Sequence, residues 1–341
     1  MRRSAFLLAV AAAVLSATAG TAPSSATARQ PIALGISAPD STNPAVLDLS
    51  LASVGQPPAL WTIWSTWGDR AGLERCTKGH GTCAFPTDTA RALVARGITP
   101  MILWQPTDPA NPSAGRFERL RSISRGRHDR YIRAWAKAAA TVDGPVIVRF
   151  AHEMNGTWFP WSLTNFDNSP SRYRDAWRHV VRVFRSAGAR NVRFLWSPFQ
   201  RCTTCSPAAY RDFYPGNRYV DYLGVTAINW GGATWTSLEG LVADSLRELR
   251  QLTRTRARPL GKPVILPEVA SNWDGDKAGW IRDGYATVLR RWRQVKAIVY
   301  FDYDMTFAGQ PDWRLAQPPD GPALAAYQAR AADPAFQASA A

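Results

Sequence analysis

Eight short apolar runs, most of them separated by segments of helical periodicity, constrain the fold of this chain more than any other feature. The runs are almost continuously apolar, as expected of parallel strands that are buried on both faces. We expect strands at residues 32–39, 59–67, 98–105, 145–152, 192–196, 220–229, 263–269 and 295–301. We expect helices at residues 87–97, 128–142, 171–187, 238–253, 277–292 and 322–330.

This order of elements predicts an α/β fold, namely a single-domain (β/α)8 TIM barrel. Such a barrel takes about 250 residues plus insertions, and the chain has 341. A doubly wound open sheet is the alternative. Its nucleotide-binding version is disfavoured because no glycine-rich phosphate loop follows the first predicted strand. No internal repeat or linker divides the sequence, so we expect one barrel domain over residues 30–335.

The first 28 residues have the pattern of a signal peptide. Arg2 and Arg3 precede an apolar run at residues 5–15, and small residues follow up to the A-T-A of residues 26–28. This order is typical of a secretory signal that is cleaved at the small residues. The run is too short to span a bilayer, which needs about 20 apolar residues. We therefore expect a secreted, extracellular protein without a membrane span.

The four cysteines fall into two local pairs, Cys76 with Cys83 and Cys202 with Cys205. Export to an oxidising compartment favours a disulfide within each pair. A four-cysteine metal site and a redox-active C-x-x-C at residues 202–205 are the alternatives.

The net charge of +15 comes mainly from arginine. These arginines are scattered and do not form a basic block, so we do not expect a nucleic-acid partner. Attraction to an anionic cell wall or an acidic polysaccharide is compatible with this charge. Four widely separated histidines give little basis for a metal site, and we expect no metal, no cofactor and a monomer.

Tryptophan is unusually frequent, with 15 in the chain. Aromatic faces carry partial negative charge and suit the flat C–H faces of sugar rings. We expect core packing to account for about half of these residues and a polysaccharide-binding cleft for others. Several recur near predicted strand ends: Trp64, Trp67, Trp104, Trp158, Trp161, Trp196 and Trp230.

Two predicted strands end in a glutamate, Glu153 after the fourth strand and Glu268 in the seventh. Polar residues at the carboxyl ends of barrel strands face the active site. Retaining hydrolysis of a glycosidic bond needs two carboxyl groups about 5–5.5 Å apart. A single glutamate of this kind is often part of a structural ion pair. The crowding of Arg149, His152 and Asn155 around Glu153 instead favours an active site, because such groups are costly to bury unless they pair.

The segment R-F-A-H-E-M-N-G-x-W, from Arg149, resembles the acid/base signature of glycoside hydrolase family 26, which contains β-mannanases and lichenases. The segment P-V-I-L-P-E-V-A-S, from Pro263, resembles the nucleophile strand of that family. Segments at Gly126, Asp276 and Asp312 resemble its flanking parts, so that the resemblance covers roughly residues 30–335.

The resemblance implies a barrel with catalytic glutamates on strands four and seven, Glu153 as acid/base and Glu268 as nucleophile. It implies that Arg149 holds the carboxylates from beneath and that Trp158 lines the leaving-group subsite. The residues assigned to substrate binding are Arg149, His152, Asn155, Trp158 and Trp230. Ile228 departs from the family, which usually has at this position a Tyr that donates a hydrogen bond to the nucleophile. Tyr300 and Tyr303 are the candidates to replace that donor.

The sequence therefore predicts a secreted retaining endo-β-glycanase that acts on a β-1,4-linked polysaccharide. Mannan is the first candidate substrate and mixed-linkage β-glucan the second. The alternatives are a non-catalytic carbohydrate-binding barrel and an enzyme that hydrolyses a polysaccharide of the cell envelope.

Overall fold

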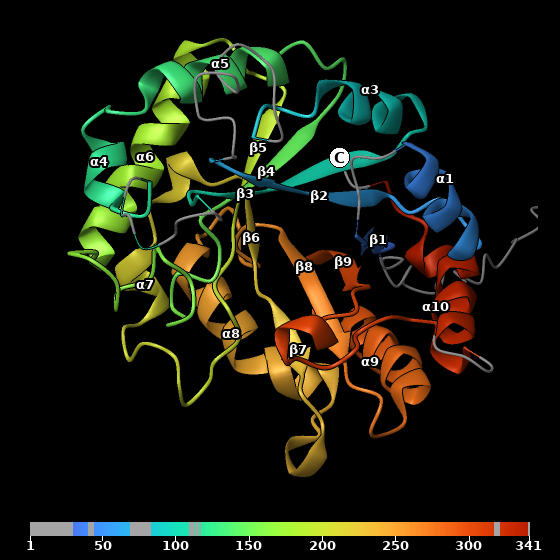
Figure 1. Cartoon of the computed structure of the whole chain (residues 1–341). Helices are drawn as coiled ribbons and strands as arrows, with labels where there is room; N and C mark the ends of the chain where they lie inside the picture. The colour runs from blue at the N-terminus through green and yellow to red at the C-terminus, as the bar shows by residue number, and fades with distance from the viewer. Residues whose placement is uncertain are drawn as a thin grey trace, which may run out of the picture.

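A closed barrel of parallel strands, surrounded by helices, forms the protein in the computed structural model (Figure 1). The structure describes residues 30–39, 44–68, 83–108, 113, 115, 117–316 and 321–339. The predicted signal peptide and Cys76 lie outside these residues. The strands are β1 (Ala33–Ser37), β2 (Leu60–Thr66), β3 (Thr99–Gln105), β4 (Val146–Phe150), β5 (Val192–Trp196), β6 (Tyr222–Gly224), β7 (Ala227–Asn229), β8 (Val264–Ser271) and β9 (Val295–Phe301).

These nine strand segments occupy eight positions in the barrel. Both β6 and β7 pair with β8, so they are two halves of the sixth barrel strand, interrupted at residues 225 and 226. The pairing of β1 with both β2 and β9 closes the sheet. The predicted (β/α)8 barrel is confirmed, and β8 is its seventh strand. The domain boundaries at residues 30 and 335 stay a prediction.

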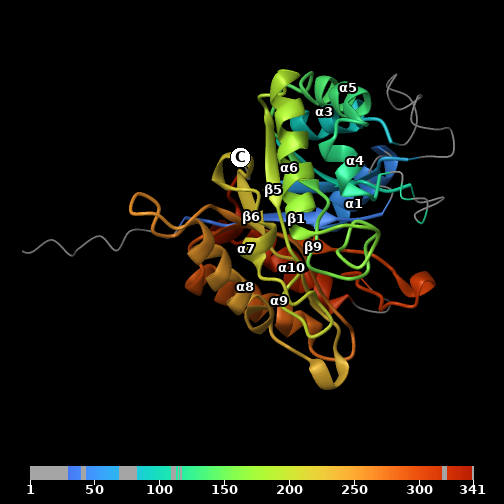
Figure 2. The same cartoon turned by 90° about the vertical axis from the view of Figure 1, so that its left-hand side faces the viewer.

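Among the described residues, the helices that cover the barrel confirm the six predicted ones and add three. In Figures 1 and 2, α3 to α6 lie on one side of the barrel, and α8 and α9 lie on the other. Among the described residues, none of the helices combines the length and the apolar character that crossing a bilayer requires. The helices are α1 (Pro44–Ser53), α3 (Thr87–Ala95), α4 (Leu120–Ser124), α5 (Asp129–Ala139), α6 (Pro170–Ser186), α7 (Tyr210–Phe213), α8 (Leu238–Thr253), α9 (Lys277–Arg291) and α10 (Pro322–Ala332).

Side chains of β4 alternate between the helices and the barrel interior, as the two-residue period of a strand requires. Val146, Val148 and Phe150 pack in the layer between strands and helices. Ile147 packs with apolar side chains from other strands in a separate cluster. The same alternation points Arg149 into the barrel, one layer above Ile147. The strand thus delivers a fully buried cation to the level at which the neighbouring strands end.

A disulfide joins Cys202 and Cys205 in the segment that follows β5, as predicted. The structure therefore contradicts the four-cysteine metal site, because two of its four thiols are joined to each other. The predicted pairing of Cys76 with Cys83 stays a prediction, because Cys76 is not among the described residues.

Candidate active site

The guanidinium of Arg149 joins the two glutamates that the sequence singled out. Its Nη1 donates a hydrogen bond of 2.5 Å to Glu268, and its Nη2 lies 3.6 Å from an oxygen of Glu153. The remaining donors go to the hydroxyls of Ser197, at 2.7 Å from Nε, and of Thr226, at 2.5 Å from Nη2. Arg149 is fully buried, so its charge is balanced within the site and both carboxylates are held from beneath. Arg149 thus lies beneath the carboxyl pair and does not line the open cleft, although the sequence assigned it to substrate binding.

The backbone at the end of β4 turns sharply to bring Glu153 back over Arg149. Ala151 and Glu153 have φ angles of 41° and 52°, in the left-handed region that non-glycine residues rarely adopt. Hydrogen bonds hold this turn, from the Glu153 amide to the Ser197 carbonyl at 2.8 Å and from the Gly156 amide to the Glu153 carbonyl at 2.8 Å. Strained backbone of this kind clusters at functional sites.

Glu268 reaches the site through an irregularity in β8. Its pairing with β9 shifts register between Leu266 and Val269. Pro267 lies in this interval and has no backbone N–H to give to the ladder. Irregularities of this kind re-aim side chains and are frequent next to active sites. Here the shift accompanies a carboxylate that bonds to Arg149 inside the barrel.

Glu153 and Glu268 form a close, buried carboxyl pair. They are 6% and 5% exposed, and one oxygen of each lies within 4.8 Å of the other, with a ring nitrogen of His152 inside the same limit. Retaining glycosidases separate their carboxyl groups by about 5–5.5 Å, whereas inverting ones need about 6.5–9.5 Å to admit a water molecule. The geometry therefore suits the retaining mechanism.

Burial, followed by the negative charge of Glu268, raises the pKa of Glu153 to about 7. Arg149 and hydrogen bonds from Thr226 and Trp158 act in the opposite direction. A carboxyl group with this pKa keeps its proton in a large fraction of molecules at neutral pH. That is the state a general acid needs, beside a second carboxylate that can attack.

His152 faces the cleft as an uncharged side chain. Burial, and then the positive charge of Arg149, lowers its pKa well below the usual range. Its ring packs edge-on against Phe159 at 4.5 Å between centroids. Among the described residues, none gives the buried Nδ1 of His152 a hydrogen-bond partner. The imidazole lines the cleft beside the carboxyl pair, and its role in binding a ligand stays a prediction.

Trp158 lies over the acid/base candidate, and its Nε1 donates a 2.9 Å hydrogen bond to Glu153. A Cβ on Gly156 would come within 2.5–2.8 Å of the Trp158 ring. Only glycine leaves room for the indole in this position, which explains the spacing of N-G-x-W in the motif. The indole is 44% exposed and meets Phe199 edge-on at 4.9 Å, so it forms a wall of the cleft.

Asn155 does not line the cleft, although the sequence assigned it to substrate binding. It is fully buried, and its side-chain amide bonds to both the amide and the carbonyl of Phe199, at 2.7 and 3.1 Å. Its own carbonyl accepts a hydrogen bond from Ser206. The structure thus places Asn155 as the link between the segment after β4 and the segment after β5.

The cleft above the two glutamates has a volume of about 880 Å³ and is rich in aromatic side chains. Trp230, which is 45% exposed, meets Trp313 edge-on at 5.2 Å. Trp313 was not predicted as a site residue. The other predicted strand-end tryptophans, Trp67, Trp104, Trp161 and Trp196, are buried in the core. The aromatic side chains that line the cleft are Trp64, Trp158, Phe159, Phe199, Trp230, Phe301 and Trp313.

Ile228 lines the cleft beside the carboxylates and has no hydroxyl to offer. The prediction that Tyr300 or Tyr303 replaces the family Tyr was wrong. The hydroxyl of Tyr300 donates to the carbonyl of Trp313 at 2.9 Å, and that of Tyr303 donates to the carbonyl of Ala38 at 2.7 Å. The donor that the structure gives to Glu268 is Arg149.

A metal ion is disfavoured at this centre. His152, Glu153 and Glu268 are close enough to be considered as ligands. The guanidinium of Arg149, however, bonds to Glu268 and lies 3.6 Å from Glu153. Its fixed positive charge would repel a cation at these distances.

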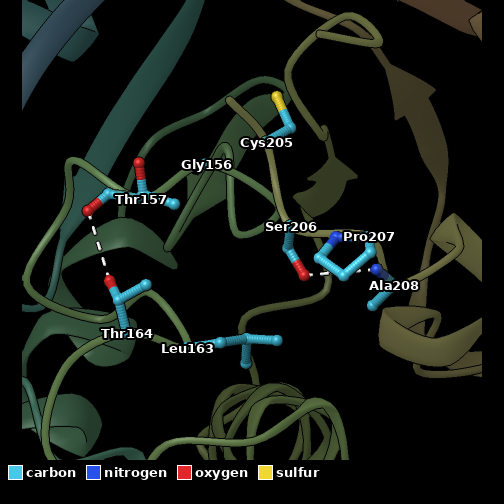
Figure 3. A pocket seen from close by; sticks show the side chains of 8 residues that line it. All are labelled: Gly156, Thr157, Leu163, Thr164, Cys205, Ser206, Pro207 and Ala208. Carbon is cyan, nitrogen blue, oxygen red and sulfur yellow. Dashed lines mark hydrogen bonds between the residues drawn. The ribbon is translucent and has the colours of Figure 1, made fainter. Parts of the chain in front are cut away.

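A second hollow of about 630 Å³ lies beside the loop that carries Trp158. Figure 3 shows Thr157, Thr164 and Leu163 on one side of it and Ser206 and Pro207 on another. None of the eight described residues that line this hollow carries a charge or an acid–base group. The chemistry therefore belongs to the cleft with the glutamate pair.

Comparison with known proteins agrees with the motifs. Residues 127–252 match the sequence model of glycosyl hydrolase family 26. The chain is a relative of this family, as predicted. Endoglucanase H of Acetivibrio thermocellus is 30% identical over 248 residues, which make up 70% of this chain and 25% of that protein. A mannan endo-1,4-beta-mannosidase of Bifidobacterium adolescentis is 36% identical over 100 residues, 27% of this chain and 9% of that protein.

This chain spans about a quarter of the length of Endoglucanase H and of a Vibrio relative named beta-1,3-xylanase TXYA. Solved structures agree in fold. An endo-β-1,4-mannanase from Cellulomonas fimi superposes with a TM-score of 0.64 and 20% identity, covering 90% of this chain and 71% of that one. The family 26 β-mannanase BoMan26A from Bacteroides ovatus superposes with a TM-score of 0.63 and 16% sequence identity, and the match covers 90% of each chain.

Proposed function

We propose that this chain is a retaining endo-β-glycanase in which Glu153 is the general acid/base and Glu268 the nucleophile. The observation that carries the proposal is the buried carboxyl pair, with oxygens within 4.8 Å and with Arg149 joining both groups. The raised pKa of Glu153 favours its protonated form, which a general acid needs. Two carboxyl groups in different environments are what the two roles require.

In the first step, Glu268 attacks the anomeric carbon while Glu153 gives its proton to the departing glycosidic oxygen. The C–O bond to the leaving sugar breaks, and an α-linked glycosyl ester forms on Glu268. In the second step, Glu153 takes a proton from water, whose oxygen attacks the same carbon and releases Glu268. Two inversions leave the product with its original β configuration.

Aromatic walls on both sides of the carboxyl pair favour cleavage within a polymer. Trp158 bonds to Glu153, the group that serves the leaving sugar. Trp230 follows β7, which pairs with the strand that carries Glu268. Sugar rings can therefore pack against indoles on both sides of the scissile bond.

A β-1,4-linked polysaccharide is the proposed substrate class, with mannan first and mixed-linkage β-glucan second. Mannanases occur among both the sequence relatives and the structural neighbours. A relative named Endoglucanase H matches 70% of this chain, which supports the second candidate. We further propose a secreted monomer that needs neither a metal nor a nucleic-acid partner; the signal pattern at residues 1–28 and the scattered arginines support this.

Incubation of the purified protein with mannan, glucomannan, lichenan and xylan tests the proposal. We expect oligosaccharides of several lengths to appear early, because an endo-acting enzyme cuts within the chain. A Glu268→Gln preparation is the control for contaminating activity. Release of single sugars alone would contradict endo action. A protein that binds a β-glycan and hydrolyses none would instead be the non-catalytic barrel.

The activity should fall on the alkaline side as Glu153 loses its proton. Because the pKa of Glu153 is raised to about 7, kcat/KM on a polysaccharide should be about half lost near neutral pH and should fall about tenfold for each further pH unit. Glu268 must be ionised to attack, so the complete profile should be bell-shaped. The control is an aryl glycoside with a good leaving group, which needs little protonation. On this substrate, kcat/KM should not fall on the alkaline side. An alkaline midpoint below pH 5 on the polysaccharide would contradict the assignment.

A further inference from the structure

Lys277, the first residue of α9, is a buried cation that the catalytic steps do not use. It is 2% exposed, and its Nζ donates hydrogen bonds to the carbonyl oxygens of Trp313, at 3.0 Å, and Arg314, at 2.7 Å. The amino-terminal end of a helix carries partial positive charge and disfavours a cation. Burial and the position at the start of a helix both disfavour a lysine at residue 277. The hydrogen bonds to the two carbonyl oxygens are the main interactions that offset this cost.

The surroundings of Lys277 point to the same pairing. Its Nζ lies 4.2 Å from the centre of the Trp273 ring and 5.8 Å from that of Tyr300. Burial lowers its pKa to about 7, against the opposing charges of Asp302 and Asp312. A buried amine is costly unless it is hydrogen-bonded. The amine and the backbone at residues 313 and 314 therefore hold each other in place.

Trp313 links this buried amine to the cleft. Its carbonyl accepts a second hydrogen bond from the hydroxyl of Tyr300, and its amide donates to the carbonyl of Tyr303 at 2.8 Å. Its indole is only 1% exposed at the edge of the cleft and packs edge-on against Trp230, which is exposed in the cleft. A shift of the backbone at residue 313 would therefore displace the indole that supports Trp230 in the wall of the cleft.

We propose that Lys277 is a positioning residue that fixes the buried Trp313 and, through it, holds the exposed Trp230 in place as an aromatic wall of the sugar-binding cleft. Lys277 touches no group in the carboxyl pair, so its effect should fall on substrate binding and not on the chemical step. That kinetic consequence rests on the proposed function, whereas the structural consequence does not.

The structural test is fluorine NMR of protein labelled with 5-fluorotryptophan. The substitution Lys277→Met keeps the apolar stem and removes the ammonium. We expect the signals of Trp313 and Trp230, assigned with Trp313→Phe and Trp230→Phe, to shift, while that of the core residue Trp177 stays in place. If the Trp313 signal keeps its wild-type position, the proposal is wrong.

Two further variants keep this test decisive. Lys296 is a half-buried lysine whose Nζ bonds to the side chain of Gln30, so Lys296→Met should leave every tryptophan signal unchanged. If Lys277→Met does not fold, Lys277→Gln keeps an N–H donor and should shift the Trp313 signal by a smaller amount. An unshifted Trp313 signal in a folded Lys277→Gln would overturn the proposal.

The kinetic test separates this proposal from the proposed function. For Lys277→Met on a polysaccharide, we expect KM to rise about tenfold and kcat to change by less than about twofold, as when uniform binding is lost. An equal fall in kcat and kcat/KM would contradict a role in wall positioning. If the wild type hydrolyses no β-glycan, the proposed function fails, and the NMR shift still decides the position of Trp313.

Discussion

Replacing Glu268 with alanine should lower the hydrolysis of every susceptible β-glycan by several orders of magnitude. Without this carboxylate, no covalent glycosyl intermediate can form, whatever the leaving group. Rates on a polysaccharide and on an activated aryl glycoside measure the effect, and both should fall together. Glu239→Ala is a matched control, because Glu239 on α8 pairs with Arg291 at the end of α9, at 2.6 Å, and does not line the cleft. Wild-type rates on the aryl glycoside would exclude Glu268 as the nucleophile.

Loss of Glu268 also leaves Arg149 with less compensation. Breaking a buried ion pair by removing one partner typically costs about 3–5 kcal/mol of stability, so a melting curve must accompany the rates. Glu268→Gln keeps an oxygen that can accept the hydrogen bond from Arg149. It should be better folded than the alanine variant and just as inactive. This separates a lost nucleophile from a lost fold.

Replacing Glu153 with alanine should have a different signature. Substrates with good leaving groups need little protonation, so the first step on an activated glycoside should survive. The second step should be slow because no base activates the water, and the glycosyl intermediate should accumulate as a burst. Azide needs no general base, so it should restore turnover and give a β-glycosyl azide. The measurement is product analysis with and without azide.

The asymmetry between the two variants is the informative part. If azide rescued neither variant, or if rescue of Glu153→Ala gave an α-azide, the assignment of roles would be wrong. An α-azide from Glu268→Ala would agree with the assignment, because azide can then enter from the side that the nucleophile has left.

The sequence predicted the barrel and its carboxyl pair well because both depend on local patterns. Parallel strands that are buried on both faces appear in the sequence as apolar runs, and each glutamate lies at the end of such a run. The second half of the sixth strand, β7, was included in one predicted strand, since the backbone break at residues 225 and 226 leaves no mark in an apolar run. The short helices α4 and α7 carry too few turns for a helical period to show.

The contacts within the site were harder to predict because they join distant segments. Thr226 bonds to Arg149, 77 positions earlier in the chain, and a single hydroxyl in an apolar strand gives no signal of that. Asn155 stands in the catalytic motif but turns to the backbone of Phe199. Tyr300 lies in β9 and Tyr303 follows it, yet their hydroxyls donate hydrogen bonds to backbone carbonyls and not to Glu268. In each case, the contact depends on the direction in which the side chain points, and the residue type alone does not determine that direction.

Identification of the covalent intermediate tests the central claim most directly. Glu153→Ala is incubated with an activated β-glycoside of the preferred sugar, digested after the burst and analysed by peptide mass spectrometry. We predict one added glycosyl group on the peptide that contains Glu268, and none in Glu153→Ala protein that also carries Glu268→Gln. A burst with the glycosyl group on another residue, or wild-type hydrolysis that first releases the α-anomer, would contradict the account.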